Sequence, residues 1–560
     1  MRRLILLIPF LFFFSCKKAT VIPTGLVTEE AMVVSAREEA SKIGVEIMKK
    51  GGNAFDAMVA TELSLAVAFP FAGNIGGGGF MVYRKNNGEV GGIDYREKAP
   101  LAAHRDMYLD SLGNVIPNMS TVGATAVGVP GTVAGVFEVH EKFGSLPMEE
   151  ILEPIIGLAK KGVIVTEKQA SRLDRLRERV IEVSGDSTKF AQVFKAGDTI
   201  KYPELAATLE IISEKGKDGF YKGEVAEKLA SFIQEKGGFI TVEDLAKYEA
   251  KWRQPVIFNY KDLKIISMSP PSSGGVTMNQ MFTMIEPYDI GQYGHNSEQA
   301  IQLFTEAARR AYADRNYYLG DPDFVDIPLD VLLSQSYLKD RFSTFSFEKA
   351  TPSDSVSHGT LEIVESMETT HYSIIDDEGN AVSATTTLNG AYGSKLYHDE
   401  LGFFLNNEMD DFSAKVGVPN MFGLIGAEAN SIAPEKRMLS SMTPTIVEKD
   451  GALYMVVGTP GGSTIINFVA QTILNTYEFN MSMQDAVNAP RFHHQWLPDL
   501  IMFETEGFSD ELKSNLKAKG YNIFEGPARI GGKVDAIRVM PDGRLEGGAD
   551  KRGDDKAVGF

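Results

Sequence analysis

The chain has 560 residues, 43% of them hydrophobic and 23% charged, so it can bury a large core and is an ordered globular protein rather than a disordered one. The formal net charge is −19 and no stripe of Lys and Arg stands out. This argues against nucleic acid as a partner, because phosphate binding requires clustered positive charge. Length alone suggests about two to four domains.

The first residues have the pattern of an export signal. Two arginines precede an apolar run over residues 4–14, which is too short to cross a bilayer but has the size of a signal core. Ser15 then precedes Cys16, the only cysteine, as at the lipidation site of a bacterial lipoprotein; an ordinary signal peptide with an incidental cysteine is the alternative. We expect residues 1–15 to be removed and the protein to be periplasmic or anchored to a membrane of the bacterial envelope through a lipid on Cys16.

Residues from about 30 to 345 are predicted to be mainly helical, with Gly-rich interruptions. The spacing of apolar residues indicates an amphipathic helix over 38–50, ended by two glycines, and a largely buried helix over 53–69. Four glycines at 76–79 lead into a strand over 80–84. Because no Gly-Lys-Ser/Thr follows them, we expect a close approach of backbones there rather than a phosphate loop.

The character of the sequence changes at Thr369. The preceding segment, 345–368, is rich in Ser, Thr, Pro and acidic residues and is expected to form an exposed loop. Two β-rich segments, 369–375 and 381–387, flank a strong turn signal and predict a β-hairpin. If the turn is centred on its middle residue, Thr369 faces Thr387 across the strands, where one hydroxyl could orient the other. Taken alone, the segment is better explained as an edge strand with polar residues on one face.

Further strands are expected over 443–448 and 453–457, and a helix from 464 to about 477. The Gly-rich turn between the last strand and this helix presents unpaired backbone N–H groups. Such a turn suits an oxyanion hole at Gly461 and Gly462, although a plain strand–helix turn is the alternative. Strands and helices mix without strict alternation, which favours an α+β fold.

Polar residues cluster in two otherwise apolar regions, at 406–411 and at Ser440-Ser441. Carboxylates can bind an ammonium group, and serine hydroxyls can bind a carboxylate. Paired carboxylates also suggest glycosidase chemistry or a calcium site. Asp410 and Asp411 would point in opposite directions on a strand, which weakens both of those ideas.

Together these segments resemble the γ-glutamyltranspeptidase (glutathione hydrolase) proenzyme family, from about residue 35 to the end of the chain. The resemblance implies the four-layer αββα sandwich of N-terminal-nucleophile hydrolases. The matching segments are residues 50–57, 94–97, 271–275, 369–371, 406–412, 440–441, 460–463 and 489–492.

The resemblance implies that the precursor cuts itself between Glu368 and Thr369, leaving a large chain, 16–368, and a small chain, 369–560. The Thr369 hydroxyl would attack the preceding carbonyl, and water would hydrolyse the resulting ester. The freed α-amine, with a pKa of roughly 7.7–8.0, would then act as the general base for its own hydroxyl. Thr387 would hydrogen-bond this nucleophile, and His371 would be structural.

The resemblance also assigns the substrate contacts of a γ-glutamyl amide such as glutathione. N–H groups of Gly461 and Gly462 would bind the oxyanion. The α-carboxylate would contact Arg96, Ser440 and Ser441, and the α-ammonium would contact Asn389, Glu408 and Asp411. The acyl group would pass to water or to an amino acid or peptide, without a metal or organic cofactor. A lid over 419–430 would carry Phe422 where some members have a tyrosine.

Two other readings remain open on sequence. A related acylase would remove glutaryl-type side chains from β-lactam nuclei, but such substrates lack the ammonium group that Glu408 and Asp411 would bind. A non-catalytic exported lipoprotein would use the fold as a binding module. The intact Thr369, Thr387 and glycine pair argue against it.

Overall fold

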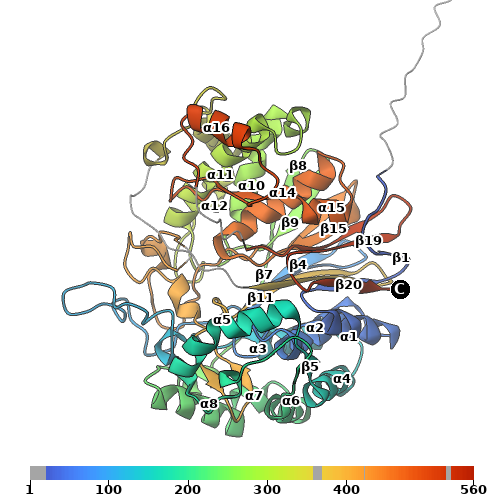
Figure 1. Ribbon diagram of the computed structural model, residues 1–560, viewed down its shortest axis with the longest axis vertical. Helices are drawn as coiled ribbons and strands as arrows, with labels where there is room; N and C mark the ends of the chain where they lie inside the picture. Colours follow the sequence, from blue (N-terminus) through green and yellow to red (C-terminus); the bar gives the residue numbers. More distant parts are fainter. Residues whose placement is uncertain (1–20, 357–368, 422, 525–530) are drawn as a thin grey trace, which may run out of the picture.

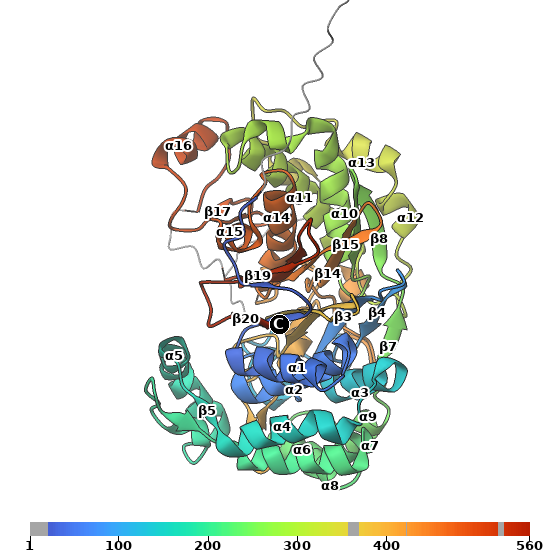
Figure 2. The same ribbon diagram turned by 90° about the vertical axis from the view of Figure 1, so that its right-hand side faces the viewer.

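The computed structural model describes residues 21–356, 369–421, 423–524 and 531–560, and these form four layers (Figure 1). Two antiparallel sheets of seven strands lie face to face, and helices cover the outer face of each sheet (Figure 2). The predicted αββα arrangement is therefore confirmed.

The first sheet has the strand order β1 (Val27–Thr28), β19 (Leu545–Ala549), β18 (Asp535–Val539), β15 (Ala452–Gly458), β14 (Thr445–Lys449), β9 (Leu263–Ser267) and β8 (Val256–Tyr260). The second sheet has the order β20 (Lys556–Gly559), β2 (Met32–Ser35), β10 (Thr370–Ile375), β11 (Ala381–Thr387), β3 (Gly78–Arg84), β4 (Val90–Asp94) and β7 (Lys251–Arg253). Three two-stranded sheets pair β5 (Val163–Ile164) with β6 (Thr199–Ile200), β12 (Tyr397–His398) with β13 (Phe403–Phe404), and β16 (Phe492–His493) with β17 (Met502–Phe503).

The helices fall into two groups, one on each side of the sheets (Figure 2). On the side of the second sheet lie α1 (Glu38–Lys49), α2 (Ala54–Ala68), α3 (Thr132–Phe143), α4 (Met148–Lys161), α5 (Glu167–Ser184), α6 (Pro203–Lys215), α7 (Asp218–Tyr221), α8 (Gly223–Glu235) and α9 (Val242–Ala246). On the side of the first sheet lie α10 (Gly274–Ile285), α11 (Glu298–Tyr318), α12 (Leu329–Leu332), α13 (Gln335–Phe342), α14 (Ile465–Tyr477), α15 (Met483–Asn488) and α16 (Asp510–Ala518).

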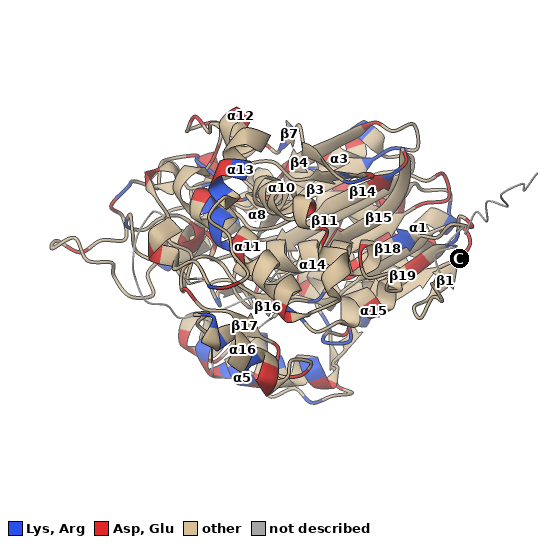
Figure 3. Cartoon of the chain, turned by 90° about the horizontal axis from the view of Figure 1, so that it is seen from above, with Lys and Arg blue, Asp and Glu red and all other residues tan. Residues whose placement is uncertain are grey.

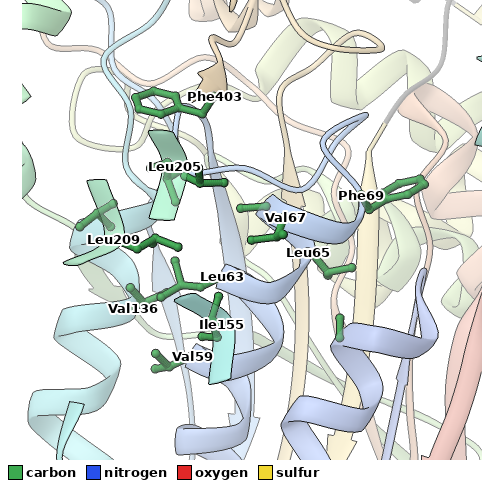
Figure 4. Packing of buried hydrophobic residues seen from close by; sticks show 14 of the residues in the cluster. Val59, Leu63, Leu65, Val67, Phe69, Val136, Ile155, Leu205, Leu209 and Phe403 are labelled. Carbon is green, nitrogen blue, oxygen red and sulfur yellow. The ribbon is translucent and has the colours of Figure 1, made fainter. Parts of the chain in front are cut away.

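Helix α2 is the centre of one large hydrophobic core. Every residue of α2 is buried, because the helix lies between the second sheet and the outer helices. Figure 4 shows Val59 and Leu63 of α2 packed among Val136, Ile155 and residues of α6. Asn53 caps the helix and forms a reciprocal capping box with Asp56, which fixes where it begins. A second core lies between the two sheets and beneath α10, α11 and α14.

Most predicted elements of the small-chain region are confirmed within one or two residues. Helices α1 and α2 and strand β3 also match their predictions. The glycine run is a site of close approach, since a Cβ at Gly77 would lie 2.1 Å from the Thr387 carbonyl oxygen. The prediction of a mainly helical stretch up to residue 345 was wrong in part, because it also contains β4, β7, β8 and β9.

The segment predicted as an exposed loop is described only over 345–356. Most of it is exposed or half-buried, but Ser353 is buried and its N–H donates to Asp499 at 2.9 Å. In Figure 3 acidic and basic residues are interspersed along α5 and α16 rather than gathered by sign. Among the described residues no helix is long and apolar enough to cross a membrane.

Candidate active site

Thr369 and Thr387 meet at one end of the central hairpin. The pairing of Thr370 with Thr386 and of His371 with Thr385 gives the predicted register. Alternate residues of a strand share a face, so Thr369 and Thr387 point toward the first sheet, as His371 does. Their hydroxyl oxygens are 3.5 Å apart, and both residues are buried. The predicted pair is therefore present, and the backbone N–H of Asn389 donates to Thr387 Oγ1 at 2.7 Å.

His371 lies in the gap between the sheets. Its ring nitrogens are 2.9 Å from Thr385 Oγ1 and 3.1 Å from Ser373 Oγ, and a Cβ on Gly458 would lie 2.3 Å from its ring. Burial lowers the pKa of His371 to about 3, so the ring is neutral at physiological pH. These contacts give His371 a packing role.

The predicted glycine pair lies where β15 runs into α14. The 3₁₀ turn Gly462–Thr464 leads directly into α14, so the N-terminal end of this helix faces the cleft. Gly461 has φ of 139°, and a Cβ there would lie 2.6 Å from the Gly531 carbonyl oxygen, so only glycine fits. Gly462 lines the same cleft as Thr369, whereas Gly461 is not among the residues that line it.

A buried charge cluster forms the other side of the cleft. The Arg96 guanidinium donates to both Glu408 and Asp411 and is 1% exposed. Glu97 lies 3.7 Å from the same guanidinium. Burial raises the pKa of Glu97 to about 8 and that of Glu408 well above its usual range, although the Arg96 charge opposes both shifts. Arg96 is thus hydrogen-bonded to Glu408 and Asp411, two of the residues predicted to bind an ammonium group.

Asp410 and Asp411 lie in a 3₁₀ helix, Glu408–Asp411, and not in a strand as expected. Their carboxylates nevertheless diverge. Asp411 faces Arg96, whereas Asp410 accepts from Ser120 Oγ at 2.7 Å and from the Met421 N–H at 2.9 Å. Asp410 therefore belongs to the outer wall of the site.

The remaining predicted residues also line the cleft. Ser440 and Ser441 are buried, and their hydroxyl oxygens accept from the Met442 N–H at 3.1 Å and from Arg315 at 3.2 Å. Asn389 adopts φ of 70° and donates its side-chain amide to the Asn407 carbonyl at 3.0 Å. The cleft is lined by Arg96, Arg315, Thr369, Thr387, Asn389, Glu408, Asp411, Leu424, Ser440, Ser441, Met442, Gly462 and Ile465.

The proposed lid contributes to the cleft wall. Leu424 lines it, and the side-chain amide of Asn420 donates to Asp411 at 3.2 Å. Phe422 lies outside the described residues, as do Glu368, Cys16 and the expected signal over residues 1–15.

Sequence reasoning missed Arg315, Leu424, Met442 and Ile465. Arg315 was the one with a detectable signal, because it is a charged residue within α11, which is buried over most of its length. Leu424, Met442 and Ile465 are ordinary apolar residues whose position depends on distant chain segments.

Comparison with known proteins places the chain among relatives that share this architecture. The model of the family described as Gamma-glutamyltranspeptidase matches residues 40–560. The Glutathione hydrolase proenzyme of Escherichia coli (strain K12) is 45% identical over 537 residues, which cover 95% of this chain and 92% of that protein.

One solved structure supports the same assignment, and a second shows the same fold. The crystal structure of Helicobacter pylori γ-glutamyltranspeptidase is 42% identical, with a TM-score of 0.57, over 60% of this chain and 97% of that chain. A cephalosporin acylase from Bacillus halodurans superposes with a TM-score of 0.83 over 99% of both chains, but at 22% identity this shows the fold alone. Matches in sequence over nearly the whole chain, together with the hairpin and cleft described above, show that this chain belongs to the γ-glutamyltranspeptidase family.

Proposed function

We propose that this chain is a self-processing glutathione hydrolase and γ-glutamyltransferase whose nucleophile is Thr369. The observation that carries the proposal is the placement of Thr369 against Thr387, in one buried cleft with Arg96, Asp411 and Ser441. A hydroxyl nucleophile and groups of both signs within one cleft suit a substrate that carries an amino acid end and a reactive amide.

Processing comes first. The Thr369 hydroxyl attacks the Glu368 carbonyl, the peptide bond becomes an ester, and water hydrolyses that ester. The products are a large chain, 16–368, and a small chain, 369–560, whose first residue has a free α-amine. This amine takes the proton of the Thr369 hydroxyl in later turnovers, which removes the need for His371 as a base.

Turnover is acyl transfer to Thr369. The hydroxyl attacks the γ-carbonyl of the substrate, and the resulting oxyanion accepts from N–H groups of Gly461 and Gly462, each such donor being worth about 2.7–4 kcal/mol. The amide nitrogen leaves with a proton, and a γ-glutamyl ester remains. Water then gives hydrolysis, and an amino acid or peptide amine gives transfer.

The two ends of the γ-glutamyl group are recognised separately. Its α-carboxylate contacts Arg96, Ser440 and Ser441. Its α-ammonium contacts Asn389, Glu408 and Asp411. A glutaryl group has no ammonium, so the buried carboxylates favour γ-glutamyl compounds over the substrates of the related acylases. The leader over residues 1–15 directs export, and a lipid on Cys16 anchors the protein to a membrane of the bacterial envelope.

The deciding experiment examines the purified protein itself. We expect two bands on a denaturing gel, with the smaller chain beginning at Thr369 by terminal sequencing, and release of the aniline from γ-glutamyl anilide but not from glutaryl anilide. Thr369→Ala should give one uncut chain without activity. A wild-type chain that stays uncut on prolonged incubation would contradict the proposal.

A further inference from the structure

Arg315 is a second buried guanidinium in the catalytic cleft. It is 5% exposed, comes from α11 on the side of the first sheet, and lines the same cleft as Arg96. Nε donates to Ser273 Oγ at 3.3 Å, Nη1 to Asn316 Oδ1 at 3.0 Å and Nη2 to Ser441 Oγ at 3.2 Å. All three acceptors are neutral, and within the described part of the chain no carboxylate forms an ion pair with Arg315.

The two arginines of the cleft therefore differ in their charge balance. Arg96 already has Glu408 and Asp411 as ion-pair partners within the protein. Arg315 has no carboxylate within ion-pair distance among the described residues, and the charge of Asp411 acts on it only from farther away. Burial lowers the pKa of Arg315 only to about 10, so the group stays protonated at neutral pH. A carboxylate that enters the cleft can therefore form a direct ion pair with Arg315, which none of the described carboxylates of the protein forms.

Arg315 also determines which way the Ser441 hydroxyl can donate. Because Ser441 Oγ accepts from Arg315, its own hydrogen is available to a ligand, and the Met442 N–H has the same effect on Ser440. The N–H and the hydroxyl of Ser273 both donate to the Ser440 carbonyl at 2.7 Å. Hydrogen bonds through Ser273 therefore connect Arg315 to the serine pair. This gives a role to Ser273, which lies in the segment 271–275 that matched the family but to which the sequence assigned no function.

We propose that Arg315 is a specificity-determining residue that supplies the countercharge for the α-carboxylate of the substrate and presents the Ser441 hydroxyl to it. The proposal rests on the proposed function and adds to it a residue that sits behind the serine pair. Arg315 acts mainly on the carboxylate end of the substrate. Its charge also lowers the pKa of Asp411, but from farther away, so its loss should affect recognition of the ammonium and the acyl-transfer chemistry much less.

The test compares two substrates that differ only in this carboxylate. We measure kcat/KM for γ-glutamyl anilide and for 4-aminobutanoyl anilide, which lacks the α-carboxylate. In Arg315→Gln the first should fall about 10- to 100-fold, mainly through KM, and the second should change by less than about threefold. The ratio of the two values does not depend on how much of the preparation is active. If the second substrate reacts too slowly, the inhibition constants of glutamate and 4-aminobutanoate give the same ratio.

Two further variants complete the design. Arg315→Lys keeps the charge but cannot donate to Ser273, Asn316 and Ser441 together, so the ratio should fall about threefold or more. Arg310→Gln, on the same buried helix but paired with Glu306, should leave the ratio unchanged.

An equal loss on both substrates in Arg315→Gln would overturn the inference, because it would mean a structural role. If that variant yields no processed enzyme, an unchanged ratio in Arg315→Lys would overturn it instead. A wild-type protein that does not release the aniline from γ-glutamyl anilide would point to failure of the proposed function, which is a separate result.

Discussion

We expect Thr387 to orient the proposed nucleophile, because the backbone already holds its hydroxyl in place. Its Oγ1 accepts from the Asn389 N–H and lies 3.5 Å from Thr369 Oγ1. We expect Thr387→Val to lower kcat about 10- to 100-fold and to slow processing, because a hydrogen bond to the nucleophile is lost while the volume is retained. Thr387→Ser should stay within about threefold of wild type. Equal activity in the valine variant, measured on γ-glutamyl anilide, would show that Thr387 does not orient Thr369.

Asp411 and its neighbour Asp410 offer a matched pair for testing recognition of the ammonium group. Asp411 faces the cleft, whereas Asp410 is bonded to Ser120 and Met421 on its outer side. We expect Asp411→Asn to raise KM for γ-glutamyl anilide about 100-fold, since a buried charge that pairs with the substrate ammonium is removed. Asp410→Asn should have little effect on KM. Unchanged steady-state kinetics in Asp411→Asn would remove the ammonium-binding role.

At the scale of elements, the sequence correctly predicted those strands and turns whose formation depends on neighbouring residues. The hairpin that carries Thr369 has a strong turn signal between two β-rich segments, and its register followed from symmetry about that turn. Strands β8 and β9 were missed, although β8 alternates buried and exposed residues, because the surrounding sequence was interpreted as helical. Arg315 was missed because its role depends on Ser273 and Ser441, which are distant in the chain.

The glycine run shows how one element constrains another. A Cβ at Gly77 would lie 2.1 Å from the Thr387 carbonyl oxygen, whereas one at Gly157, within α4, would meet no atom within 4 Å. We therefore expect Gly77→Ala to displace the end of β11, to cost about 1–3 kcal/mol and to impair processing. Gly157→Ala should be neutral or stabilising by about 0.5–1 kcal/mol. Thermal melts and gels of both variants check this, and normal processing of Gly77→Ala would refute the close-approach argument.

Glu62 of α2 is an acid buried against β10, and it should make the stability of the folded state depend on pH. Glu62 is 0% exposed, its Oε2 accepts from the Tyr372 hydroxyl at 2.7 Å, and burial raises its pKa from 4.5 to about 7. The folded state therefore binds this proton more tightly than the unfolded state. The stabilisation of the folded state by protonated Glu62 is fully present below about pH 4.5 and is lost as pH rises through 7.

Glu62→Gln removes this titration while keeping the size of the side chain. From pH 5 to pH 8 the wild type should lose up to about 3 kcal/mol through Glu62, which corresponds to about 2–3 °C in Tm for a chain of this length. The glutamine variant should show a correspondingly smaller fall in Tm over the same range. Melts at a fixed scan rate check this, and an identical pH dependence in the two proteins would exclude Glu62 as the source.

At the scale of the whole molecule, both sheets mix segments from the two sides of the proposed cut. In the second sheet β10 pairs with β2, and β11 pairs with β3. In the first sheet β14 pairs with β9, and β19 pairs with β1. Pattern reasoning reached only mixed α+β, because these pairings join residues hundreds of positions apart and leave no local signal. The layer order came from the family resemblance.

This interleaving predicts how the processed protein behaves as a whole. If the chain is cut before Thr369, the two products cannot separate without breaking hydrogen-bonded pairs in both sheets and exposing the core between them. We expect the large and small chains to co-elute as one species in native size-exclusion chromatography, even on strong dilution, and to separate only in denaturant. Sheet signal in circular dichroism and chain separation should be lost at the same denaturant concentration, since the sheets are what hold the chains together. Separation of folded chains on dilution alone would contradict the interleaved arrangement, because chains that share both sheets cannot come apart while the sheets stay folded.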